Sequence, residues 1–72
     1  MSTETGNTYH AIHGRSYRIC VYLTASNHYS SFAESPDAYL GATGEHRSPS
    51  TARLTALCLA RADAAAHRKV SA

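Results

Sequence analysis

The sequence predicts an α+β fold, in which an antiparallel sheet of two or three strands (a meander) carries one C-terminal helix packed on it. Three observations predict it. Residues 16–25 alternate with a period of two, turn signals separate this segment from weaker strand-like segments, and residues 51–66 form an alanine- and leucine-rich run without glycine or proline. Strands that precede a helix favour an antiparallel sheet over a parallel one.

The chain begins with a polar stretch over residues 1–8, which we expect to be a disordered leader before a single domain over residues 9–70. Residues 9–14 resemble a short strand that ends where Gly14 and Arg15 can turn the chain. The sequence leaves open whether residues 9–13 pair into the sheet.

Residues 16–25 form the strongest predicted strand. The core-facing set is aliphatic and aromatic, and comprises Tyr17, Ile19, Val21 and Leu23. The opposite set comprises Arg18, Cys20, Tyr22 and Thr24. Because Cys20 and Tyr22 make the second face partly apolar, we interpret it as a candidate contact surface.

Two further strands are expected after this one. Ser26 and Asn27 predict a turn, after which residues 28–34 return with Phe32 as their apolar anchor. Residues 35–37 (Ser-Pro-Asp) predict a second turn, followed by a glycine-interrupted strand over residues 37–43.

The predicted helix covers residues 51–66 and ends in the basic residues 67–69. Ser48 or Ser50 can cap its start, and Pro49 suits the first helical position if Ser48 is the cap. Two rotations remain open. One turns Leu54, Leu57, Cys58, Ala62 and Ala65 toward the sheet with Arg61 in the same stripe, and the other turns Leu57, Ala60 and Ala64 inward.

The composition predicts a thin core. The chain has 72 residues, of which 43% are hydrophobic, and most of these are alanine and tyrosine. The strongly apolar residues are Ile12, Ile19, Val21, Leu23, Phe32, Leu40, Leu54, Leu57, Leu59 and Val70. A domain of this size can gain burial by pairing with itself or with a partner, so a homodimer is one of the expected states. The net charge of +2 is too low to favour an unfolded chain.

The sequence contains no signal peptide and no apolar run long enough to span a membrane, so a cytoplasmic location without membrane association is expected. Cys20 and Cys58 fit this expectation, and we interpret both as buried small apolar residues.

No pattern of a catalytic, metal or cofactor site is present. Five histidines lack the paired spacing of zinc ligands, the acidic residues form no close pair, and the glycines form no phosphate loop. The sequence therefore predicts a non-enzymatic protein that needs no metal and no cofactor.

Tyrosine and arginine, the residue types enriched at interface hot spots, are abundant for so short a chain. We expect the partner-binding residues to be Arg18, Tyr22 and Arg61, with Tyr17 and Tyr29 in support. These residues predict a small binding protein that occupies the surface of a larger protein or ribonucleoprotein assembly. The alternative is a small nucleic-acid-binding protein that uses the same arginine and tyrosine face of its sheet.

In its size, its strand-and-helix layout and its lack of motifs, the chain resembles the small accessory proteins of phages and mobile elements, such as anti-CRISPR proteins. This resemblance implies an inhibitor that acts by covering a partner's surface. No residue role is transferred through it.

Overall fold

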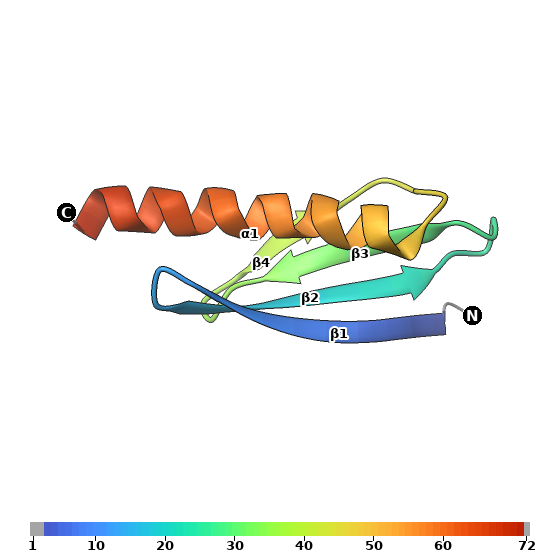
Figure 1. Ribbon diagram of the computed structural model, residues 1–72, viewed down its shortest axis with the longest axis horizontal. Helices are drawn as coiled ribbons and strands as arrows, with labels where there is room; N and C mark the ends of the chain where they lie inside the picture. Colours follow the sequence, from blue (N-terminus) through green and yellow to red (C-terminus); the bar gives the residue numbers. More distant parts are fainter. Residues whose placement is uncertain (1–2, 72) are drawn as a thin grey trace.

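The computed structural model describes the backbone of residues 3–71 and the side chains of residues 6–67, and it forms two layers (Figure 1). One layer is a four-stranded antiparallel sheet in the order β1-β2-β3-β4, and the other is a single C-terminal helix. The elements are β1 (Thr3–Ile12), β2 (Arg15–Leu23), β3 (Tyr29–Glu34), β4 (Tyr39–Ala42) and α1 (Pro49–Ser71). The predicted α+β class, meander and C-terminal helix are confirmed, and the predicted number of two or three strands was too small.

β1 accounts for the main difference from the sequence prediction. Residues 3–8, expected in a leader, belong to this strand and pair with β2, with a bulge between Glu4 and Gly6. The two-residue turn at His13 and Gly14, both with positive φ, starts a regular hairpin that continues through Thr8 opposite Ile19. Backbone pairing holds residues 3–8 at the edge of the sheet although none of them has an apolar side chain, and for this reason the sequence shows no strand pattern there.

Side-chain hydrogen bonds shape the turn between β3 and β4. The hydroxyl oxygen of Ser35 accepts hydrogen bonds from the backbone N–H groups of Asp37 and Ala38, at 3.2 and 3.0 Å. β4 that follows is short, and a register shift separates Ala33 from Glu34 where β3 pairs with it. The turn places Asp37 near the start of β2, where it contributes to the site described below.

α1 begins at the Ser48 cap. The Ser48 hydroxyl accepts a hydrogen bond from the Thr51 N–H at 3.1 Å, and Pro49 takes the first helical position. Of the two caps that the sequence allowed, Ser48 is therefore the one used. Within the described residues, α1 lacks the continuous apolar length that a membrane-crossing helix requires.

The buried face of α1 consists of alanine. Ala52, Ala56, Ala60 and Ala64 follow one another at intervals of four and have no exposed surface, whereas Leu54 is 60% exposed. The second of the two predicted rotations is therefore the observed one, since Ala60 and Ala64 face inward and Leu57 is half-buried. Cys58 consequently lies exposed, which corrects its interpretation as a buried residue.

The alanines pack on the face of the sheet formed by Tyr17, Ile19 and Ala33, which are fully buried. Four partly buried residues surround this cluster: Ile12, Leu40, Leu57 and Leu59. Since alanine adds little area, the bulk of the core comes from β2.

We predict that Ala60→Leu destabilises the protein by about 1–3 kcal/mol, because the added side chain has to fit between α1 and the sheet. Leucine and alanine have similar helix propensities, so the effect reports packing rather than helix formation. The urea midpoint of unfolding measures it.

Ala62→Leu is the matched control, since Ala62 is exposed on the same helix. It should change stability by no more than about 0.5 kcal/mol. Equal urea midpoints for the two variants would contradict the close contact of α1 with the sheet at residue 60.

Candidate interaction surface

The face of the sheet opposite α1 is the first candidate functional surface. β2 contributes Arg18, Cys20 and Tyr22 to it, since residues of this parity point away from the core residues Tyr17 and Ile19. Directly opposite residues share a face, so the strand pairs add Tyr9, Phe32, Glu34 and Tyr39, together with the small or polar residues Asn7, Ser30 and Ala42. We use the term open face for the first four of these and the three residues of β2.

Three rings form a row across the open face. The centroids of Tyr22 and Phe32 lie 6.3 Å apart, and those of Phe32 and Tyr39 lie 5.7 Å apart, both in tilted arrangements. Phe32 is half-buried in the middle of the row, whereas Tyr39 is 58% exposed. Contacting rings of this kind have little freedom to lose when a partner binds.

Arg18 is held in place beside this row. Its guanidinium carbon lies 5.4 Å from the centroid of Phe32, and its Nε donates a hydrogen bond to Glu34 Oε1 at 2.8 Å. Arg18 Nη2 donates to the same oxygen. The hydrogen bonds to Glu34 raise the pKa of Arg18 above its ordinary value. The arginine therefore presents an ordered donor group whose charge is balanced by a carboxylate on the same face.

Cys20 shows how closely the open face is covered by its own side chains. It is only 2% exposed, although it lies on the face that α1 does not cover. Phe32 is its direct cross-strand neighbour, and Arg18 and Tyr22 flank it on β2. The open face is thus a second small packed layer with a buried thiol beneath it.

A shallow hollow of about 300 Å³ lies at one end of the open face. Its lining includes Tyr9, Ser16, Arg18, Glu34 and Pro36. The Arg18–Glu34 pair contributes to its wall, so a group that enters it would meet both a donor and an acceptor.

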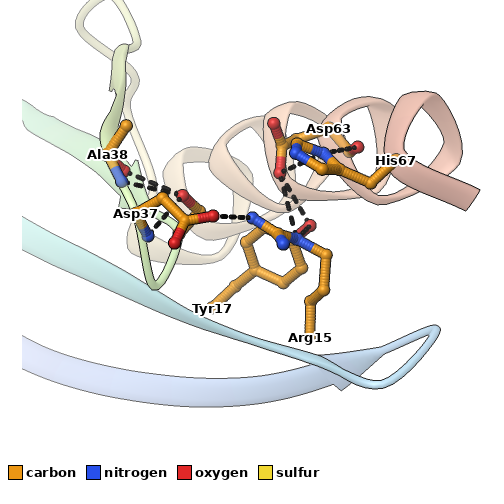
Figure 2. Close-up of polar contacts among 7 residues, drawn as sticks. Arg15, Tyr17, Asp37, Ala38, Asp63 and His67 are labelled. Carbon is orange, nitrogen blue, oxygen red and sulfur yellow. Dashed lines mark hydrogen bonds and ion pairs between the residues drawn. The ribbon is translucent and has the colours of Figure 1, made fainter. Parts of the chain in front are cut away.

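A cluster of charged and hydroxyl groups lies on the helix side of the sheet (Figure 2). The Tyr17 hydroxyl donates to Asp63 Oδ2 at 2.8 Å and accepts from Arg15 Nε at 3.2 Å. Arg15 Nη2 in turn pairs with Asp37 Oδ2 at 2.9 Å. His67 Nδ1 lies 3.5 Å from Asp63 Oδ2, which completes the cluster. These groups connect β2, the β3–β4 turn and α1.

Tyr17 lies at the centre of this cluster, which we call the clamp because it connects α1 to the sheet. Its side chain has no exposed surface, and only the hydroxyl reaches the polar groups at the margin of the core. Burial, followed by the hydrogen bond to Asp63, raises the pKa of Tyr17 above its ordinary value of 10.0. The hydroxyl thus stays protonated and continues to donate to Asp63 throughout the neutral range.

The five sequence-predicted contact residues do not form one site. Arg18 and Tyr22 share the open face, as their alternation predicted, whereas Arg61 lies exposed on α1. Tyr17 is buried in the core and cannot offer a contact surface in this fold. The register places the half-buried Tyr29 on the sheet face that α1 covers.

Sequence reasoning missed four members of the open face: Tyr9, Phe32, Glu34 and Tyr39. The alternation of Phe32 and Glu34 in the third strand could have indicated two of them. Tyr39 follows a register shift, so no regular period points to it.

Metal-binding side chains do not gather in threes anywhere among the described residues. No family model, curated protein or solved structure matches the chain.

We predict that Tyr17→Phe lowers the free energy of unfolding by about 1.5–3 kcal/mol, since it removes the 2.8 Å hydrogen bond to the charged carboxylate of Asp63. Urea unfolding at neutral pH measures the loss. Tyr39→Phe removes the hydroxyl of an exposed tyrosine and should change stability by no more than about 0.5 kcal/mol. An equal loss in both variants would show that the clamp contributes nothing specific.

The raised pKa of Tyr17 also predicts a pH dependence. A group with a raised folded-state pKa contributes stability that is fully present below its unfolded value, here 10.0, and is lost as the pH rises through its folded value. The difference in stability between the wild type and Tyr17→Phe should therefore shrink above pH 10. Urea midpoints of both proteins at neutral and alkaline pH test this, and a constant difference would contradict it.

Proposed function

We propose that the protein is a non-enzymatic binding protein that uses its open face to occupy the surface of a larger protein or ribonucleoprotein assembly. The observation that carries the proposal is the row of Tyr22, Phe32 and Tyr39, with Arg18 fixed over Phe32, on the sheet face that α1 leaves uncovered. Aromatic and arginine anchors of this kind dominate the energetics of protein interfaces.

The charge of the open face supports a protein surface as the partner rather than nucleic acid. Nucleic-acid affinity comes largely from cations that neutralise phosphates. The cation of the open face, Arg18, already pairs with Glu34, and the whole chain carries a net charge of only +2. A phosphate would have to displace Glu34 or bind beside its negative charge.

The hollow beside Arg18 supports binding rather than catalysis. Its two charged lining residues, Arg18 and Glu34, are hydrogen-bonded to each other, so a substrate would have to compete with this pair for either group. A partner side chain of mixed polarity fits such a hollow better than a reacting small molecule does.

An inhibitor that acts by covering a surface needs no more than one ordered face on a small stable scaffold. The open face meets this requirement, since α1 packs on the other side of the same sheet and is anchored there by the hydrogen bond between Tyr17 and Asp63. We therefore include in the proposal the role of a phage-type inhibitor that works in the cytoplasm.

We predict that the double substitution Arg18→Ala/Tyr22→Ala abolishes capture of the partner while the domain stays folded. Truncation of hot-spot residues costs about 2 kcal/mol or more each, which raises Kd more than tenfold. A pull-down with tagged protein from lysate of the cells that naturally express it, read by mass spectrometry, measures capture. Circular dichroism and the urea midpoint verify folding.

Arg47→Ala is the matched control, because it removes an exposed arginine from outside the open face, and it should not reduce capture. Arg61→Ala tests separately the predicted contact residue that lies on α1. A loss confined to Arg61→Ala would move the contact to α1, and unchanged capture by the folded double variant would refute the open face. Recovery that disappears after nuclease treatment would indicate nucleic acid, or a ribonucleoprotein held through its RNA.

A further inference from the structure

The outer edge of β1 is the long strand edge that this sheet leaves uncovered. β1 pairs with β2 on one side and has no strand on its other side in the described sheet. Natural edge strands are usually protected by lysine, proline, bulges or short length. The bulge of β1 lies at its start, between Glu4 and Gly6, and residues 6–12 that follow pair regularly and contain no charged residue and no proline. The opposite edge is protected, since β4 has only four residues, a register shift and a positive-φ glycine.

The turn at His13 and Gly14 determines which backbone groups of β1 point outward. In a two-residue hairpin the residues that flank the turn form a hydrogen-bonded pair, and hydrogen-bonded and non-bonded pairs then alternate along the ladder. Ile12 and Arg15 are the flanking pair here. The pairs Ala11–Ser16 and Tyr9–Arg18 are thus non-bonded. Tyr9 and Ala11 therefore direct their N–H and C=O groups away from β2.

We propose that two copies of the chain associate through β1, which joins their sheets into one continuous antiparallel sheet with Tyr9 opposite Tyr9. In this register the N–H of each Tyr9 donates to the carbonyl of the other, and Ala11 of each copy lies opposite Asn7 of the other. The inference goes beyond the proposed function and does not depend on it.

The side chains suit this register on both faces of the joined sheet. On the open face, the two Tyr9 rings, each 72% exposed in one copy, would cover each other as a cross-strand aromatic pair. On the helix side, Thr8 would lie opposite His10. These two residues already form a 3.1 Å hydrogen bond within one chain. None of the residue pairs in this stretch brings two like charges together.

A second copy is the occupant that the composition of the domain favours. The buried apolar side chains larger than alanine are Tyr17, Ile19, Cys20 and Val21, and such a thin core gains from association. Antiparallel pairing of identical edges is also closed by symmetry, so it ends at two copies. Both helices would lie on one face of the joined sheet, and the two open faces would form one surface on the other.

The test measures the mass of the full chain by light scattering from micromolar to millimolar concentrations. The wild type should approach the mass of two chains. Tyr9→Lys and Tyr9→Glu should each raise the dimer dissociation constant on the order of tenfold, since equal charges would face each other across the axis. An equimolar mixture of the two variants should restore the dimer, because opposite charges then meet. Tyr9→Phe should remain dimeric.

A wild type that stays monomeric over the whole range would overturn the proposal. So would an unchanged dimer dissociation constant in both charged variants, or an equimolar mixture that dimerises no better than either variant alone. Circular dichroism checks that the variants fold. Should they not, Ala11→Pro removes an outward N–H without adding charge, and it should weaken the dimer by a similar factor if the β1 edge is the interface.

Discussion

α1 approaches the sheet through Ala52, Ala56, Ala60 and Ala64, whose short side chains set the distance between the two layers. β2 fills this narrow space with the bulk of Tyr17, Ile19 and Val21. The close approach has consequences elsewhere: it turns the larger helix residue Leu54 to the outside, at 60% exposure. α1 thus covers the core residues on one face of the sheet. The other face has no helix, so only its own side chains or a partner can shield it from solvent.

An interface made of alanine buries little apolar area, so polar contacts at its margin carry more weight than in a domain with a larger core. The hydroxyl of Tyr17 meets this need. The ring belongs to the core, and the hydroxyl bonds to Asp63 of α1 and to Arg15 of its own strand. Arg15 extends the connection to the β3–β4 turn through Asp37. One tyrosine thus contributes to the apolar packing and anchors the helix.

The parts of the fold that the sequence revealed are those where the side-chain pattern and the backbone agree. The alternation in β2 correctly assigned Tyr17 and Ile19 to the core and Arg18 and Tyr22 to the other face. Two features of the fold could not be predicted from the sequence, for physical reasons. Residues 3–8 of β1 form an edge strand that is held by backbone hydrogen bonds and needs no apolar pattern. The rotation of α1 about its axis could not be predicted, because both the alanines and the leucines of the helix could form its buried face. The narrow space between the helix and Tyr17 admits the alanines.

In the candidate site too, the residues that belong to one strand's side-chain pattern could be predicted and the others could not. Arg18 and Tyr22 could be found because one strand presents both, whereas Tyr9, Phe32 and Tyr39 reach the open face from three other strands. A surface assembled across a sheet depends on register, which turns and bulges set without leaving a period in the sequence. The same register points the backbone of Tyr9 outward and its ring onto the open face. One residue therefore belongs both to the proposed contact surface and to the proposed dimer edge, and pairing at that edge would enlarge the surface available to a partner.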